Sequence, residues 1–251
     1  MPVIVIGIPK NVYLLPNHFI MKKFFILIII ISLGISAKAQ SRKTFTVNPG
    51  QKIVEAIPAG ELYSYPEFRL GTVTLRNGTS ADVKLNYNSI FGEMQFIDPK
   101  KGDTISLADE KNIRFVTVEK DTFYFDEVWL QLVFSNNTVK IARKRLLEMT
   151  NKEKLGAMGV EGYGGAIETY SKFTGSQHMR DLVAKEKLTY TEHITYYIGE
   201  RFNHFYKANK KSLLDFYREQ EEKVGAWLKE NKIDFSRTDD IKKVFDYLQS
   251  L

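Results

Sequence analysis

Alternation of apolar and polar residues is the clearest pattern in this chain. Residues 80–88, SADVKLNYN, change from apolar to polar at almost every step. Such a period of two predicts a strand with one face on a core and the other face in water. The preceding pair Asn77-Gly78 tolerates positive φ at both positions and therefore predicts a tight hairpin turn.

Similar short runs, each followed by turn residues, fill residues 67–148. They are FRLGTVTL, SADVKLNYN, GEMQFI, TISLA, IRFVTV, TFYF, VWLQLVF and TVKIARK. Eight closely spaced strands predict an antiparallel β domain built as a meander, closed as a roll, a sandwich or a small barrel. Their connections are too short to hold crossover helices, which argues against a parallel sheet.

The pattern changes after residue 148. Residues 149–180 are rich in glycine and are expected to form a linker region. Residues 181–251 are expected to form a β-hairpin with its turn at Gly199-Glu200, followed by two helices. A helix is the alternative for the hairpin, because Tyr196, Glu200 and His204 also fall at helical spacing.

Capping residues mark the two C-terminal helices. Asn209 is expected to cap a helix that ends near residue 231. Ser236 with Asp239 three positions later is similar to a capping box at the start of the second helix. The predicted fold class is therefore α+β, with the meander first and the hairpin and helices after it.

Residues 21–39 have the parts of a secretory signal peptide. Lys22 and Lys23 give a positive start, and the largely apolar run at 24–36 is 13 residues long. This run is shorter than the roughly 18 residues expected of a membrane span, so cleavage is favoured over a retained anchor.

Ala37 and Ala39 form the small-x-small pattern that precedes cleavage, which places Gln40 at the new N-terminus. Residues 1–20 fit no part of a signal and are best explained by a start codon assigned too early. The approach segment at 40–66 contains three prolines, which limit regular structure. We therefore expect an exported protein, periplasmic, secreted or associated with the outer membrane, without a transmembrane span in the mature chain.

Composition narrows the possible partners. The chain contains no cysteine, so it has neither a lipid-anchor acceptor nor a disulfide framework. Its net charge is +6, but residues 1–39 hold four lysines and no acid, which leaves 32 basic against 30 acidic residues. A nearly balanced surface gives no reason to expect nucleic acid as a partner.

The stretch FRLGTVTLRNGTSADVKLNYNSIFGEMQFID resembles an uncharacterised family of exported proteins from Bacteroidota-type bacteria. The similarity lies in a strand, an N-G turn, LNYN and GEMQF, and it extends more weakly over residues 65–251. The resemblance implies export and the order of strands before helices. It implies no active residues.

No catalytic, cofactor or metal signature is found in the sequence. The glycine-rich GVEGYGG matches neither the P-loop nor the dinucleotide fingerprint, and a flexible link is the simpler interpretation. His178, His193 and His204 are scattered and lack the spacing of metal ligands. No G-x-S-x-G elbow occurs, and the abundant carboxylates cannot be paired without geometry.

Aromatic residues near the predicted hairpin are the candidate binding surface, and they are Tyr190, Tyr196, Tyr197, Phe202 and Tyr206. Exposed rings there would bind a glycan, a peptide or an envelope protein. The alternative is that alternate rings fill the core. We expect a non-catalytic binding or structural module without cofactors. A periplasmic hydrolase with converging carboxylates and an accessory subunit of an outer-membrane assembly are the alternatives.

Overall fold

The computed structural model describes residues 42–155, 161–163, 183–200 and 202–251. All of them fall within one compact unit, Arg42–Leu251. The predicted signal peptide, with Ala37, Ala39 and Gln40, lies outside the described residues, as does most of the glycine-rich region.

The described residues form one sheet of twelve strands in which every pairing is antiparallel. The strands are β1 (Thr44–Val47), β2 (Arg69–Leu75), β3 (Ser80–Asn88), β4 (Glu93–Ile97), β5 (Thr104–Ser106), β6 (Ile113–Val118), β7 (Asp121–Asp126), β8 (Val128–Ser135), β9 (Lys140–Leu155), β10 (Glu161–Tyr163), β11 (Lys187–Gly199) and β12 (Phe205–Lys207). Their main order is β1-β11-β9-β8-β7-β6-β2-β3-β4-β5, while β10 pairs with β9 and β12 pairs with β11.

All eight strands predicted from alternation are present as β2 to β9, so the α+β class with an antiparallel meander is confirmed. The meander is divided in two, however. Strands β2 to β5 form one part and β6 to β9 the other, and the parts join where β6 pairs beside β2, with Val116 opposite Val73. The connection from β5 to β6 contains the short 3-10 helix η1 (Glu110–Asn112).

The sheet curls back on itself. The Tyr87 hydroxyl at the end of β3 donates a hydrogen bond of 2.9 Å to the backbone oxygen of Arg145 in β9. Just beyond, the Leu147 amide donates to the Ser89 backbone oxygen over 2.8 Å. Because β3 and β9 are five positions apart in the strand order, these contacts close a roll. The core inside this roll contains Val73, Leu85, Tyr87, Met94, Ile113, Val116, Val118, Phe123 and Trp129.

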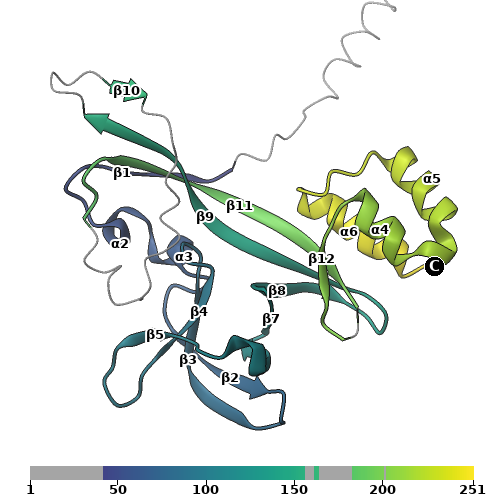
Figure 1. Cartoon of the computed structure of the whole chain (residues 1–251), viewed down its shortest axis with the longest axis horizontal. Coiled ribbons are helices and arrows are strands. Elements are labelled where there is room, and N and C mark those ends of the chain that lie inside the picture. Colours follow the sequence, from purple (N-terminus) through teal and green to yellow (C-terminus); the bar gives the residue numbers. More distant parts are fainter. Residues whose placement is uncertain (1–41, 156–160, 164–182, 201) are drawn as a thin grey trace, which may run out of the picture. The chain divides into compact units, whose positions relative to one another are not determined.

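Strands β9 and β11 are the longest and run side by side (Figure 1). Strand β9 passes the expected boundary at residue 148 and continues to Leu155, where β10 pairs with it. The expected hairpin is present as β11 and β12, and Gly199 pairs with Phe205 beside its turn. One sheet therefore extends through segments that the sequence divides.

The C-terminal helices pack against β9 and β11. Helix α4 (Lys210–Phe216) begins with the expected cap, since Asn209 Oδ1 accepts from the Ser212 amide at 2.9 Å. The first predicted helix is interrupted by the 3-10 helix η3 (Arg218–Gln220) and resumes as α5 (Glu221–Asn231). No helix within the described part of the chain is long and apolar enough to cross a membrane.

The capping box expected at Ser236 and Asp239 is wrong. Helix α6 (Thr238–Leu248) has Arg237 at its N-cap, without a side-chain hydrogen bond. Ser236 instead donates from its amide and hydroxyl to Asp234 Oδ1, over 2.9 and 2.7 Å. The amide and hydroxyl of Ser236 are therefore used in a local turn with Asp234, and Ser236 lies one residue before the cap position. The helix still buries its apolar face, which contains Ile241, Val244, Phe245 and Leu248.

The approach segment is more regular than its prolines suggested. It contains β1 and two single-turn helices, α2 (Ile53–Ala56) and α3 (Ala59–Leu62). Pro58 occupies the N-cap of α3, where the missing amide hydrogen costs nothing. The segment packs against β9 and β11. The buried residues of this core are Val47, Ile53, Ile57, Leu62, Leu147, Ala184 and Tyr190.

Replacing Gly71 by alanine is expected to destabilise the fold by about 1–3 kcal/mol. A Cβ on this β2 residue would lie 2.4 Å from the Thr117 backbone oxygen, which is held in β6. Gly60→Ala is the control, because its Cβ would meet only Pro66 at 3.8 Å. Urea unfolding of both variants measures the difference, and equal stabilities would contradict the close approach of β2 and β6.

Candidate functional site

Two arginines face the protein interior on strand β9. Side chains on a strand alternate between faces, so Arg143 and Arg145 share a face with Ile141 before them and Leu147 after them. Both of those apolar residues are buried, in two separate cores. The arginines therefore lie along β9 between these two cores, and their charges need partners.

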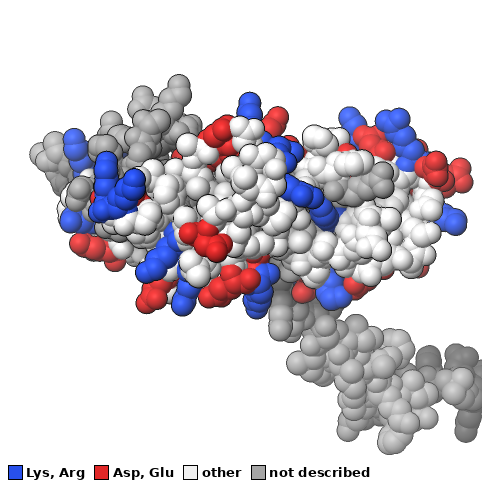
Figure 2. Space-filling model, turned by 90° about the horizontal axis from the view of Figure 1, so that it is seen from below, with Lys and Arg blue, Asp and Glu red and all other residues white. Residues whose placement is uncertain are grey.

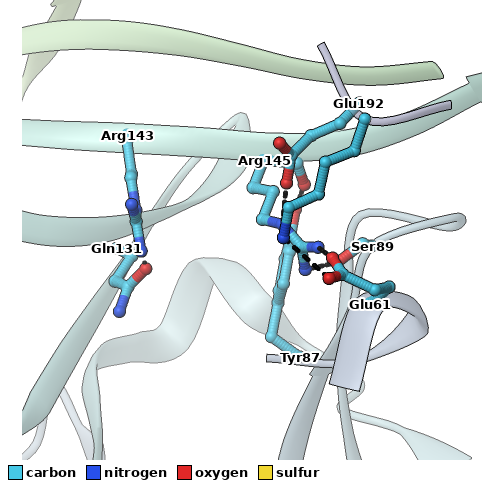
Figure 3. Close-up of polar contacts among 8 residues, drawn as sticks. Glu61, Tyr87, Ser89, Gln131, Arg143, Arg145 and Glu192 are labelled. Atoms are coloured by element: carbon cyan, nitrogen blue, oxygen red, sulfur yellow. Dashed lines mark hydrogen bonds and ion pairs between the residues drawn. The ribbon is translucent and has the colours of Figure 1, made fainter. Parts of the chain in front are cut away.

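Arg145 binds three side chains (Figure 3). Its Nε lies 2.6 Å from Glu192 Oε1, its Nη2 lies 2.8 Å from Glu61 Oε2, and its Nη1 donates to Ser89 Oγ over 2.9 Å. The Arg145 side chain is only 13% exposed. Charge-assisted bonds of this kind are stronger than neutral hydrogen bonds.

These partners come from elements that are distant in the sequence. Glu61 belongs to α3, Ser89 follows β3, and Glu192 belongs to β11. Lys43, directly before β1, also binds Glu61 Oε1 at 2.7 Å. We call Lys43, Glu61, Tyr87, Ser89, Gln131, Arg143, Arg145 and Glu192 the central polar cluster. It joins the roll, the approach segment and the long strands, and sequence reasoning did not find it.

Arg143 has a different environment from Arg145. Its Nε donates to Gln131 Oε1 over 2.9 Å, and the side chain is partly buried. Beside it lies a cavity of about 10 Å³, lined by both arginines, Gln131, Ser64 and the rings of Tyr87, Phe123 and Trp129. A space of this size accommodates about one water-sized particle.

A second polar feature lies within the roll. Trp129 Nε1 donates to Glu110 Oε1 over 2.8 Å, and Glu93 lies near enough to repel the Glu110 charge. Burial raises the pKa of Glu110, and the Glu93 charge raises it further, while the indole hydrogen bond opposes both. Glu93 itself accepts from Ser106 Oγ over 2.5 Å.

Glu110→Gln is expected to stabilise the protein at pH 7 by less than about 1 kcal/mol, since the partial exposure of Glu110 screens its charge. The folded pKa of Glu110 lies above its ordinary value of 4.5. The protein therefore has its full stability with respect to this group below pH 4.5, where the carboxyl is neutral. Stability is lost as the pH rises through the raised pKa, because the carboxyl then becomes charged in a partly buried environment.

Urea unfolding at several pH values tests this expectation. The gain should vanish at low pH, where the wild-type carboxyl is already neutral. Glu67→Gln is the control, because Glu67 is exposed. A gain of the same size at all pH values would show that ionisation of Glu110 is not its cause.

Two of the aromatic candidates do not belong to an exposed surface. Tyr190 is 7% exposed and Tyr196 is 1% exposed, and they lie in different cores. The Tyr196 hydroxyl shares a hydrogen bond of 2.5 Å with Thr238 Oγ1 in α6. Their positions on β11 alternate onto the face that the sheet buries, so these two rings are not available on an exposed surface.

The other three candidates remain accessible to different degrees. Tyr197 points to the opposite face of β11 and is partly buried, which raises the pKa of its hydroxyl. Phe202 and Tyr206 are 64% and 54% exposed. The hairpin therefore presents two exposed rings at its end.

Tyr206 lines a surface groove of about 450 Å³ between the β11–β12 hairpin and helix α4. Its other lining residues are Glu200, Ser212, Asp215, Phe216 and Arg218. Within the described residues, no ion pair joins these carboxylates to Arg218. Two aromatic rings, two carboxylates and a guanidinium thus face one space large enough for a small ligand. We call it the Tyr206 groove.

A second groove, of about 440 Å³, lies at the mouth of the roll. Its apolar wall comes from β2, β6 and the loop before η1, and its polar residues are Arg76, Asn77, Asp109 and Asn112. The Arg76 guanidinium donates to the Lys111 backbone oxygen over 2.8 Å. Polar groups of this groove therefore make hydrogen bonds within or between the loops to which they belong.

Metal chemistry finds no support among the described residues. Within them, no group of three histidine, aspartate or glutamate side chains is arranged to hold an ion. His193 lies 4.0 Å from Glu148, His204 is exposed, and His178 lies outside the described residues. Basic and acidic side chains are interspersed on the face shown in Figure 2, and neither sign covers a continuous area there.

No protein-family model, curated protein or solved structure matches this chain. The class that can be stated is therefore structural. It is an α+β protein with a curled antiparallel sheet, a central polar cluster and a helical C-terminal end. The resemblance to an exported bacterial family stays a prediction.

Proposed function

We propose that this protein is an exported, non-catalytic module of the cell envelope that binds a glycan or a peptide. The observation that carries this proposal is the Tyr206 groove, where an exposed ring lies beside polar side chains not paired with one another. Export is supported by the signal pattern at residues 21–39.

The chemistry of this groove suits a ligand with both apolar and hydrogen-bonding surfaces. Tyrosine gives a large contact area at a low cost in conformational entropy. Glu200 and Asp215 supply acceptors for hydroxyl or amide groups, and Arg218 supplies donors. Sugar rings and peptide backbones both present such surfaces.

Tyr206→Ala is expected to weaken ligand binding at least about tenfold, as for a central aromatic contact. Binding of the purified protein to envelope glycans and peptides measures the change. Phe202→Ala is the matched control, because Phe202 is also more than half exposed but is not among the residues that line the groove. Equal binding by both variants and the wild type would remove the groove from the proposal.

Export has its own test. Expression of the native gene, fractionation and sequencing of the mature N-terminus should give a chain that starts at Gln40 or Ser41 outside the cytoplasm. A chain that keeps residues 24–36 in the membrane fraction would instead establish an anchored protein.

A hydrolase is the second candidate, and Glu110 with Glu93 is the observation in its favour. Neighbouring carboxyl groups with one raised pKa are typical of acid–base sites. Against it, Glu110 binds the buried Trp129, and neither carboxyl lines one of the three cavities described above. Turnover of an envelope substrate that Glu110→Gln abolishes would overturn the non-catalytic proposal.

A further inference from the structure

The charges of the central polar cluster are unevenly distributed. The cluster contains two carboxylates, Glu61 and Glu192, and three cations, which are Lys43, Arg143 and Arg145. Both carboxylates bind Arg145, and Lys43 takes the second oxygen of Glu61. Arg143 makes no contact within 4.0 Å to an aspartate or glutamate of the described residues.

The environment of Arg143 makes this imbalance costly. Its side chain is partly buried, and its neighbours on the same face are Ile141 along β9 and Tyr196 across to β11. A cation removed from water is unfavourable unless a charge or hydrogen bonds compensate it. Gln131 supplies a neutral acceptor for one N–H of Arg143 and no negative charge.

Both arginines that line the small cavity have N–H donors left over from the hydrogen bonds described above. A guanidinium has five N–H donors. The hydrogen bonds described above use one donor of Arg143 and three of Arg145. Both arginines and the residue Ser64 line the cavity, together with three aromatic rings.

We propose that this cavity is a binding site for one small monovalent anion of the halide class, held chiefly by Arg143. The volume of about 10 Å³ selects the ligand, because it accommodates one water-sized particle and is too small for a carboxylate or a phosphate. The anion supplies the negative charge that neither Glu61 nor Glu192 gives to Arg143. This site is independent of the Tyr206 groove and of its ligand.

The first test compares thermal unfolding of the purified protein in sodium chloride and sodium gluconate at equal ionic strength. A ligand that binds only the folded state raises the melting temperature, and at ten times its Kd the rise is about 3–6 °C for a chain of this size. Bromide should substitute for chloride, whereas gluconate is too large for the cavity. Equal melting temperatures in all three salts would overturn the proposal and leave water as the occupant.

Two variants place the effect at Arg143. Arg143→Met should lose the difference between chloride and gluconate. Arg76→Gln is the matched control, because Arg76 also donates from Nε to a protein oxygen but is exposed. It should keep the whole difference. A response to chloride that survives in Arg143→Met would place any halide site elsewhere.

Broadening of the chlorine NMR line by the folded protein gives a second readout. Wild-type protein should broaden the line, and added bromide should reverse the effect by competition. Arg143→Lys, which keeps the charge with fewer donors, should broaden it less and covers the case in which Arg143→Met does not fold. Undiminished broadening by Arg143→Lys and Arg143→Met together would count against the site.

Discussion

Replacing Arg145 by methionine is expected to lower the free energy of unfolding by about 3–5 kcal/mol. Methionine retains much of the side-chain volume but leaves Glu192 without its cation and Glu61 with Lys43 alone. The side chains of Glu61 and Glu192 are only 24% and 14% exposed, so water compensates them poorly. Urea denaturation at pH 7 measures the loss.

Lys242→Met is the matched control for this prediction. Lys242 pairs with Asp246 four residues later on α6, and both side chains are more than half exposed. Such a pair contributes about 0.3–0.5 kcal/mol. If Arg145→Met cost no more than Lys242→Met, the central polar cluster would be energetically equivalent to a surface ion pair.

A second substitution separates the charge from the packing. In the Arg145→Met background, Glu192→Gln removes the stranded carboxylate and should recover about 1–2 kcal/mol, within the range of coupling between residues in contact. In the wild-type background the same change removes a partner of Arg145 and should destabilise. Opposite signs in the two backgrounds identify the ion pair as the source of the loss.

The strands could be predicted because each one has its own local alternation of apolar and polar residues. Residues 80–88 place Leu85 and Tyr87 on the buried face by alternation alone. The order of the strands in the sheet could not be predicted. Nothing in the run IRFVTV indicates that β6 pairs with β2 and not with β5. That pairing depends on how the η1 segment returns the chain, which is a tertiary property.

The central polar cluster lies beyond local patterns for a similar reason. Arg143 and Arg145 have the same parity as Ile141 and Leu147, which is a sign that they point inward. Their partners cannot be read from the sequence, since Glu192 is 47 positions and Glu61 is 84 positions from Arg145. The inward position was predictable in principle, and the pairing was not.

The burial of one aromatic candidate could have been predicted from the local alternation of residues. Tyr196 lies between Ile194 and Ile198 at a period of two, which predicts a buried position. Tyr206 pairs opposite Ile198 on the short strand β12 at the end of the sheet, where the structure leaves its ring exposed. Parity assigns Tyr196 to the core, whereas the exposure of Tyr206 follows from the place where the sheet ends.

Trp129→Ala is expected to lower the free energy of unfolding by about 3–5 kcal/mol. The indole is 2% exposed and packs edge-on against Phe125, with ring centroids 5.4 Å apart. Its loss opens a cavity inside the roll and removes the hydrogen-bond donor of Glu110. Chemical denaturation measures the loss, and a cost below 1 kcal/mol would mean that this part of the roll collapses freely around the gap.

Trp129→Phe divides the two contributions, because it keeps a ring but removes the indole N–H. Without that donor the pKa of Glu110 rises further, since the hydrogen bond is the influence that lowers it. Because the folded pKa of Glu110 is raised, this group costs no stability at low pH, where it is neutral. The cost appears as the pH rises through that pKa. The deficit of Trp129→Phe should therefore be larger at pH 7 than below about pH 4, and adding Glu110→Gln should reduce it at pH 7. A deficit independent of pH would assign the role of Trp129 to packing alone and leave its bond to Glu110 without energetic weight.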